Sequence, residues 1–274
     1  MALYMAKAYA KINIGLAVGK KMDDGYHPIH SYFALLDFHD EIVVTIRDSS
    51  VFTCTINSSV PYLELGNVDI MEKCARAFVA ASGKCFSINI DIDKRIPSKA
   101  GLGGGSSDGA AILKILNNHY ENLLSEAELL ALGASIGSDI PFFILDSNFA
   151  YASGRGEVLK KLELPRSFES VMLFLPNEEV STKGAYSKLD MLDYPFKDLP
   201  DIFPPLLSKD LFPNDFERVC RTDMLDNVLS TYKGIAYASL SGSGSAIFVL
   251  MDSSNDEKLM KMAPCKFIVK RILR

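Results

Sequence analysis

Four glycines crowd one short segment of this 274-residue chain, and they restrict how the segment can fold. Residues 97–107 read Pro-Ser-Lys-Ala-Gly-Leu-Gly-Gly-Gly-Ser-Ser. A backbone with so few β-carbons can approach a ligand closely. The small apolar run at 110–113 predicts a helix that begins at about Ser106, and amide groups at a helix start attract phosphate. The segment therefore indicates a phosphate-binding loop.

A plainer explanation fits the same residues. Glycines beside Ser-Ser-Asp also make a flexible turn, in which a serine or aspartate side chain caps the following helix. Other nucleotide-binding fingerprints are excluded, because no Gly-Lys-Ser/Thr follows and the glycine spacing is not G-x-G-x-x-G. The H-R-D and D-F-G signatures of protein kinases are absent from the sequence as well.

Charge and cysteine usage narrow the class of partner. A net charge of −5 gives no broad basic surface, so we expect a small-molecule substrate, no nucleic acid and no membrane partner. The five cysteines are odd in number and form no C-x-x-C pair, which predicts reduced thiols and a cytoplasmic protein. No apolar run approaches the ~18 residues of a membrane span. We expect a monomer or a weak homodimer.

Periodicity describes an α+β chain. Period-two alternation predicts strands at residues 8–18, 42–46, 52–56 and 86–92, and it places Lys11 and Asn13 on one face of the first strand. Helical spacing predicts helices at 69–81, 107–117 and 125–134, the last with a capping box of Ser125 and Glu128. A strand at 149–152 follows.

The second half of the chain repeats the alternation of strands and helices. We predict strands at 171–175, 237–240, 247–251 and 267–272 and helices at 182–189, 215–229 and 255–262. This order indicates a ferredoxin-like second domain. We place the boundary between residues 150 and 170, which gives domains at 1–160 and 161–274.

Three motifs in this order resemble those of the GHMP kinases, a superfamily named for galactokinase, homoserine, mevalonate and phosphomevalonate kinases. Residues 10–13 are similar to the first motif, residues 97–107 to the second and residues 240–245 to the third. The resemblance implies an α+β fold of two domains. The N-terminal domain would be like domain 2 of ribosomal protein S5, and the C-terminal domain would be ferredoxin-like. The implied cofactors are ATP and Mg²⁺.

Residues 24–27, 137–141 and 214–217 resemble one branch of that superfamily. The branch phosphorylates the C2 hydroxyl of a methylerythritol that carries a cytidine diphosphate group, in the non-mevalonate route to isoprenoid precursors. Other kinases of the homoserine or mevalonate type remain alternatives, and so does an inactive regulator with the same fold. The Asp-Gly-Tyr-His run at 24–27 is evidence against the first alternative, and retention of Lys11 and Asp139 against the second.

The resemblance implies that Asp139 is the catalytic base and that Lys11 lies beside it. A carboxylate can accept the proton of an alcohol as the new bond forms, and a lysine can stabilise the developing charge. Spacing alone also fits Ser138 or Asp139 as the cap of a short helix opened by Ile140 and Pro141. A lone lysine inside an apolar strand is uncommon unless it pairs or snorkels.

The resemblance also assigns the nucleotide site. Ser106 or Ser107 would offer a hydroxyl to Mg²⁺, although no metal ligand is firm. Asn67 and Asp69 compete for contact with adenine, and Lys99 either approaches the nucleotide or points to solvent. The implied ATP-binding residues are Pro97, Lys99, Gly101, Leu102, Gly103, Gly104, Gly105, Ser106 and Ser107.

Substrate recognition would use aromatic and polar groups, because cytosine offers a flat face and a hydrogen-bonding edge. The implied substrate-binding residues are Asn13, Tyr26, His27, Asp139, Thr182 and Tyr186. The glycine loop of the C-terminal domain, with Gly242, Ser243 and Gly244, would steady the phosphate loop or approach the substrate phosphates. A serine-glycine hairpin between two strands explains that loop without a ligand.

Overall fold

Two compact units make up the chain, and each gathers segments that are far apart in the sequence. The computed structural model describes residues 1–61, 68–165, 168–178, 180–200, 208–252 and 256–273. The first unit comprises Met1–Ala10, Phe38–Ser98 and Gly103–Asp146, and the second comprises Lys11–Asp37, Lys99–Leu102 and Ser147–Arg274. The glycine-rich segment therefore passes from the first unit to the second and back. The division into domains at residue 160 stays a prediction.

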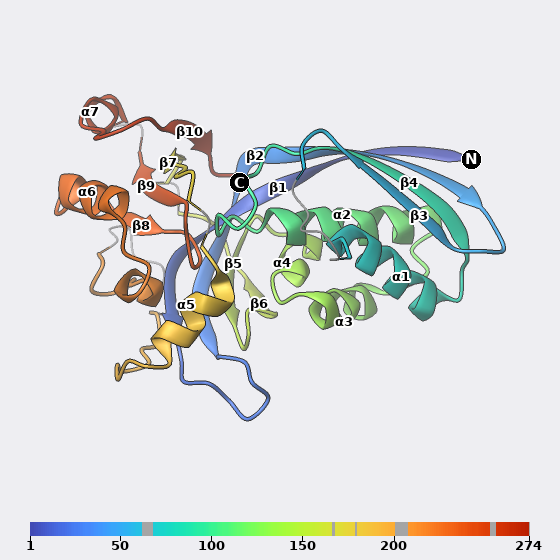
Figure 1. Cartoon of the computed structure of the whole chain (residues 1–274), viewed down its shortest axis with the longest axis horizontal. Helices are drawn as coiled ribbons and strands as arrows, with labels where there is room; N and C mark the ends of the chain where they lie inside the picture. Colours follow the sequence, from blue (N-terminus) through green and yellow to red (C-terminus); the bar gives the residue numbers. More distant parts are fainter. Residues whose placement is uncertain (62–67, 166–167, 179, 201–207, 253–255, 274) are drawn as a thin grey trace. The chain divides into compact units, whose positions relative to one another are not determined.

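Helices cover one side of the strands in the first unit (Figure 1). The second half of β2 (Ile29–Asp48) pairs antiparallel with β4 (Phe86–Asp93), and β3 (Thr53–Ser58) pairs parallel with β4. Beneath them lie α1 (Ile70–Ser82), α2 (Gly104–His119), α3 (Glu126–Ile136) and α4 (Ile140–Ile144). The alternation in β4 is confirmed, because Phe86, Ile88, Ile90 and Ile92 are all buried.

The ends of the helices show where local sequence signals were sufficient to predict the first helical residue. Asp69 caps α1, since its carboxylate accepts a hydrogen bond from the Met71 amide at 2.7 Å. The capping box of Ser125 and Glu128 at the start of α3 is confirmed. Helix α2 begins earlier than predicted, at Gly104, after Gly103 in a left-handed conformation with φ of 70°. The low helix propensity of glycine hid this start from the sequence pattern.

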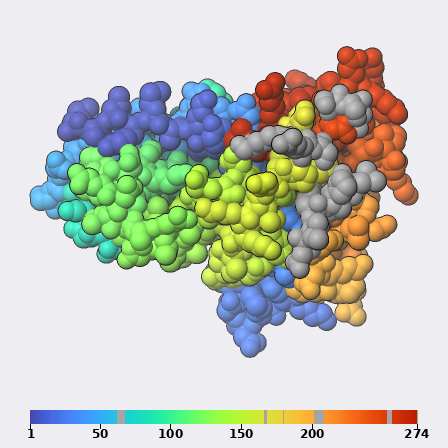
Figure 2. Space-filling model, turned by 180° about the vertical axis from the view of Figure 1, so that it is seen from behind, coloured from blue at the N-terminus to red at the C-terminus, as the bar shows by residue number. Residues whose placement is uncertain are grey.

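Strand β1 (Ala2–Val18) is longer than predicted and changes character along its length. Its first residues alternate between part-buried and exposed, and Leu3 and Met5 are exposed. Figure 2 shows these N-terminal residues lying along the helices of the first unit, where the Tyr4 hydroxyl meets His119 Nδ1 at 2.8 Å. From residue 11 to residue 18 every side of the strand is buried.

The second unit contains a four-stranded antiparallel sheet of order β10-β7-β9-β8. Its strands are β7 (Ser170–Phe174), β8 (Ala238–Leu240), β9 (Ile247–Met251) and β10 (Ile268–Arg271). Two helices, α6 (Asp223–Tyr232) and α7 (Asp256–Lys261), connect β7 to β8 and β9 to β10. This succession is the ferredoxin-like arrangement, which confirms the predicted second domain type.

Three further elements complete the second unit. The first half of β2 pairs with β5 (Phe149–Ser153), and β5 pairs with β6 (Val158–Lys161), a strand too short to show alternation in the sequence. Helix α5 (Thr182–Leu189) matches its prediction. The single helix predicted at 215–229 is wrong. The 3₁₀ turn η1 (Asp215–Arg218) ends first, and α6 starts anew behind Thr222, whose hydroxyl accepts from the Leu225 amide.

Disulfide bonds and membrane-spanning helices are not expected from the sequence. The five cysteines are free thiols. Among the described residues, no helix is long and apolar enough to cross a membrane.

Candidate active site

The start of α2 carries the features of the first unit that led to the prediction of phosphate binding. Gly103 occupies the cap position and has no side chain, so the flexible turn with a capping serine or aspartate is not what forms. Ser106 and Ser107 lie inside the first turn of the helix. The helix is 16 residues long, and its dipole adds positive potential at this end.

A buried ionic cluster of Asp40, Lys94 and Asp108 lies against this first turn. The Lys94 ammonium contacts the Asp40 carboxylate and donates to Asp108 Oδ2 at 2.7 Å. Asp108 Oδ1 is buried and has no hydrogen-bond partner. Burial raises the pKa of the Asp108 carboxyl to about 7, with Asp40 acting in the same direction and Lys94 opposing it. The pKa of Asp108 is raised mainly because burial disfavours its charged form, and one ammonium shared by two carboxylates does not offset that.

Sequence analysis left the role of Asp108 open and did not identify Asp40 or Lys94. The signal was Lys94 itself, a lysine directly after the strongly alternating strand β4. Asp40 gave no signal, because it lies within β2 between two other polar residues, the half-buried His39 and the exposed Glu41. Only the packing of α2 against these strands shows that the three residues form one cluster.

Asp139 lies at the start of α4, next to the same helix turn. It occupies the cap position, but its side chain makes no capping hydrogen bond, so its predicted alternative role as a helix cap is wrong. All five residues of α4 are buried, which anchors the segment. A methyl group at Gly137 would come 4.0 Å from Ser106 Oγ. The chain leading to Asp139 therefore lies beside the glycine-rich segment.

Lys11 and Asn13 form a buried polar chain in the second unit. Lys11 Nζ donates to Asn13 Oδ1 at 2.6 Å, and Asn13 Nδ2 donates to Ser31 Oγ at 3.0 Å. The Lys11 ammonium also lies 4.5 Å from the centre of the Phe33 ring. The two side chains are only 3% and 2% exposed. Lys11 is thus hydrogen-bonded inside this apolar strand, and Asn13 helps to orient it.

The third glycine loop, residues 240–246, is hydrogen-bonded to one arm of the glycine-rich segment, residues 100–102. Ser241 Oγ donates to the Gly101 carbonyl at 2.9 Å, and the Ala246 amide donates to the Ala100 carbonyl at 3.0 Å. On the other side, the Lys11 amide donates to the Leu102 carbonyl at 2.9 Å. This arm is thus held between β1 and the third loop.

Residues 214–217 support that third loop. Asn214 Nδ2 donates to the carbonyls of Leu240 and Gly242, at 2.8 and 2.9 Å. Glu217 Oε1 accepts from the Leu240 amide at 2.9 Å, and Asp215 Oδ2 accepts from the Val18 amide at the end of β1 at 2.9 Å. Residues 214–217, which resemble a family motif, therefore form a brace: they are hydrogen-bonded both to the end of β1 and to the third glycine loop.

The predicted substrate residues gather around α5. The His27 and Tyr186 rings stack with centroids 4.7 Å apart and planes 22° apart, and His27 Nδ1 lies 2.9 Å from the Gly19 carbonyl. Tyr26 is 55% exposed, with the Arg155 guanidinium 4.6 Å from its ring centre. One turn before Tyr186, Thr182 Oγ1 lies 3.0 Å from Ser243 Oγ of the third loop.

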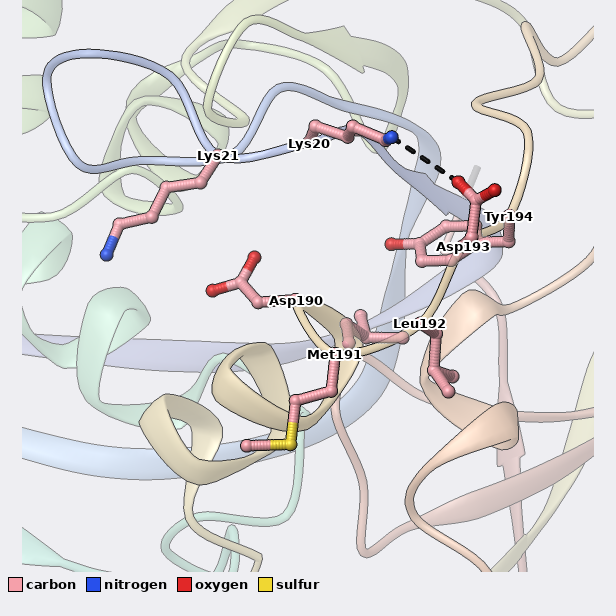
Figure 3. Close-up of a pocket in the computed structure, with 9 residues that line it drawn as sticks. Lys20, Lys21, Asp190, Met191, Leu192, Asp193 and Tyr194 are labelled. Carbon is pink, nitrogen blue, oxygen red and sulfur yellow. Dashed lines mark hydrogen bonds and ion pairs between the residues drawn. The ribbon is translucent and has the colours of Figure 1, made fainter.

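A pocket of about 420 Å³ opens beside this aromatic group. It is lined by residues 19–21 and 189–194, and Figure 3 shows Lys21 and the Asp190 carboxylate facing the same opening. Asp190 Oδ1 lies 3.5 Å from His27 Nε2, and Lys20 pairs with Asp193 at the rim. Asp190 therefore both lines the pocket and lies near His27, and the pocket carries both signs of charge.

Several assigned residues remain without a tested role. Asn67 lies outside the described residues, and the carboxylate of its competitor Asp69 caps α1. Pro97 and Lys99 are exposed. Asp139 belongs to the first unit and Lys11 to the second, so their pairing stays a prediction. Among the described residues, no three or more His, Cys, Asp or Glu side chains group as a metal site.

Comparison with known proteins gives the class of this chain. Residues 69–147, which contain α1 to α4 and the glycine-rich segment, match the family described as GHMP kinases N terminal domain. The mevalonate kinase of Methanococcus jannaschii superposes with a TM-score of 0.68 over 100% of this chain and 99% of its own, at 12% identity. The fold is that of the GHMP kinases.

Two more similar proteins narrow the class. The 4-diphosphocytidyl-2-C-methyl-D-erythritol kinase of Chlorobium phaeovibrioides is 35% identical over 91% of this chain and 88% of its own length. A crystal structure of 4-(cytidine 5'-diphospho)-2C-methyl-D-erythritol kinase superposes with a TM-score of 0.70 at 30% identity, covering 98% of this chain and 99% of that one. The chain belongs to the 4-diphosphocytidyl-2-C-methyl-D-erythritol kinase family and is a kinase that uses ATP.

The close packing of Gly101 against Ser241 predicts that Gly101→Ala has a large effect on stability and on ATP binding. A methyl group there would lie 2.0 Å from the Ser241 carbonyl oxygen, and φ is 75°. Gly83→Ala is the matched control, because Gly83 has φ of 69° and nothing within 4 Å. We expect the control to lose about 1 kcal/mol of unfolding free energy from backbone strain, and Gly101→Ala to lose more and to weaken ATP binding. Equal losses in denaturant titrations, with ATP affinity unchanged, would contradict the contact.

The buried cluster predicts a pH-dependent stability. Because the pKa of Asp108 is raised in the folded chain, its contribution to stability is present below its ordinary value and is lost as pH rises through about 7. Asp108→Asn removes this titration. The wild-type chain should therefore lose unfolding free energy relative to Asp108→Asn between about pH 5 and about pH 8, as measured by denaturant titration. Parallel pH curves for the two proteins would exclude the raised pKa.

Proposed function

We propose that this chain transfers the γ-phosphoryl group of ATP to the C2 hydroxyl of 4-diphosphocytidyl-2-C-methyl-D-erythritol, giving the 2-phosphate and ADP. The observation that carries the proposal is the glycine-bounded start of α2, with the Asp139 segment packed beside its Ser106, in a chain of this kinase family. The reaction belongs to the non-mevalonate route to isoprenoid precursors. Mevalonate kinases share the fold at only 12% identity, so the mevalonate alternative is not favoured.

Asp139 is the proposed base. As the C2 oxygen forms its bond to the γ-phosphorus, the bond from that phosphorus to the β–γ bridging oxygen breaks, and the hydroxyl proton passes to the Asp139 carboxylate. Lys11 stabilises the negative charge that develops on the transferred group. Asn13 orients Lys11 through the 2.6 Å hydrogen bond, and the Phe33 ring beneath the ammonium limits its movement.

The glycine-rich segment is the proposed cradle for the ATP phosphates. The amide groups of the first turn of α2 offer donors, and the absence of β-carbons at Gly103, Gly104 and Gly105 allows close approach. Ser106 and Ser107 are the residues that would hold Mg²⁺ together with the phosphates. Oxygen donors of this kind fit an ion that keeps few protein ligands. Bound Mg²⁺ would neutralise charge on the β- and γ-phosphates.

The substrate would lie toward α5. His27 and Tyr186 already touch each other, so a cytosine base would contact this ring pair from outside, with the exposed Tyr26 ring available on the neighbouring loop. The pocket at residues 19–21 and 189–194 would receive part of the cytidine diphosphate group. Thr182, together with Gly242, Ser243 and Gly244, would line the path from that group to the reacting hydroxyl.

Three coarser expectations belong to this proposal. The division into domains at 1–160 and 161–274 follows from the family likeness. The free cysteines support a reducing compartment, in keeping with the predicted cytoplasmic location. The predicted monomer or weak homodimer completes the description.

The test is release of ADP from Mg-ATP in the presence of 4-diphosphocytidyl-2-C-methyl-D-erythritol, with mevalonate and homoserine as comparison alcohols. Only the cytidyl alcohol should support turnover. Asp139→Asn should lower kcat by a factor on the order of 100 or more while leaving ATP affinity within about twofold, because it removes the proton acceptor and keeps the shape. Asp146→Asn, at an exposed residue just beyond α4, is the control and should be unaffected. Absence of turnover with the cytidyl alcohol contradicts the function, and an active Asp139→Asn contradicts the base.

The aromatic pair makes a separate prediction about the substrate. Tyr186→Ala should raise the KM for the cytidyl alcohol about tenfold or more with little change in kcat, because stacking is lost equally before and during phosphoryl transfer. Tyr186→Phe keeps the ring and should behave like the wild type. A Tyr186→Ala enzyme with unchanged KM would remove this ring from the cytosine site.

A further inference from the structure

One buried cluster lies at both ends of the glycine-rich segment. Lys94 comes three residues before Pro97, and Asp108 comes directly after Ser107. The side chains of Lys94, Asp40 and Asp108 are 5%, 0% and 1% exposed. Burying three ionisable groups with so little solvent around them costs folding free energy unless the groups pair with one another. Asp40 contacts the residues that lead into the glycine-rich segment, Lys94 among them (its entry), and Asp108 follows the segment directly (its exit). This position suggests that the cluster fixes the two ends of the segment.

Asp40 holds the backbone just before the glycine-rich segment. Its Oδ1 accepts from the Arg95 amide at 2.5 Å and from the Ile96 amide at 2.7 Å, which are the last two amides before Pro97. Lys94 joins this end to Asp108, the fifth residue of α2. Two backbone amides and one helix turn are thus connected through a single ammonium group.

Entry and exit also touch at Gly104. A methyl group at this glycine would lie 2.9 Å from Ile96 Cγ2 and 3.2 Å from Lys94 Nζ. The first turn of α2 therefore packs directly on the residues that lead into the segment. A movement of Lys94 would be felt in the same turn whose amides face the proposed phosphates.

We propose that Lys94 is a positioning residue for ATP: by joining Asp40 to Asp108, it holds the two ends of the glycine-rich segment at the spacing that ATP phosphates require. The proposal deepens the proposed function and rests on it for ATP as the nucleotide. Lys94 acts through Asp108 and through the Arg95 and Ile96 amides, and it need not touch the nucleotide. Its effect is therefore on ATP and not on the alcohol.

The charge balance defines the decisive variants. Lys94→Met removes the ammonium and leaves two buried carboxylates facing each other, which forces the ends apart. The double variant Lys94→Met with Asp108→Asn removes the repulsion between the two carboxylates, but it also removes the ion pairs that join Asp40 to Asp108. Arg95→Met is the matched control, because it makes the same charge change one residue away. The Arg95 side chain pairs with Asp93 and Glu41 outside the cluster, and the hydrogen bond from its backbone amide to Asp40 does not depend on that side chain.

The experiment measures three quantities for each variant: the Kd of Mg-ATP without the alcohol, the KM of each substrate, and hydrogen exchange of the amides of residues 96–108. Lys94→Met should weaken ATP binding about tenfold or more and speed exchange across 96–108, because a small misplacement of binding groups is expensive. The KM for the alcohol should stay within about twofold. The double variant should recover part of the loss, and Arg95→Met should match the wild type.

Two results would overturn the proposal. One is a Lys94→Met enzyme that loses ATP and alcohol affinity equally, or keeps both. The other is an Arg95→Met enzyme that loses as much ATP affinity as Lys94→Met. If Lys94→Met does not fold, Asp108→Asn decides: ATP affinity must fall about threefold or more while Asp146→Asn remains unchanged. Since the Kd is measured without the alcohol, a wild type that binds ATP but does not phosphorylate the cytidyl alcohol contradicts only the proposed function.

Discussion

The absence of side chains along the glycine-rich segment is the constraint on which the rest of the site depends. At Gly101 the neighbouring backbone lies so close that a methyl group would overlap the Ser241 carbonyl oxygen. At Gly104 a methyl group would come 2.9 Å from the Ile96 side chain. The segment is consequently packed closely within each unit, against backbone at Gly101 and against a side chain at Gly104. A loop fixed in this way can present its amides to an anion with little reorganisation, which is the property that phosphoryl transfer requires.

Buried charge is the second recurring feature of the described residues, and two lysines illustrate it. Lys11 lies among apolar residues of β1 and is held by Asn13 and the Phe33 ring. Lys94 lies between two carboxylates. Charges in such surroundings keep their positions, because leaving a partner unpaired costs several kcal/mol. The family's chemistry uses fixed charges, so the folding cost of burying them is offset by a site that is already arranged before substrates bind.

Local patterns predicted the elements well where a single helix or strand contained the signal. The alternation of β4, the capping box of α3 and the bounds of α5 were all visible in the sequence, because each depends on neighbours within a few residues. The predictions failed where distant contacts decided. Helix α2 starts among glycines, behind Gly103 in a left-handed conformation. The helix expected at 215–229 breaks because Asn214 and Glu217 are hydrogen-bonded to the third loop.

The sequence by itself determined the class of this protein. Three glycine and polar motifs in order, with the Asp-Gly-Tyr-His run, were sufficient for an α+β kinase, because such motifs carry backbone requirements that few other residues meet. Only the tertiary structure decided how these motifs are held. The grip of Ser241 on Gly101, the brace at Asn214 and the cluster of Asp40, Lys94 and Asp108 join residues up to 140 positions apart. No local pattern encodes such contacts, since they arise from packing of whole elements and not from spacing along the chain.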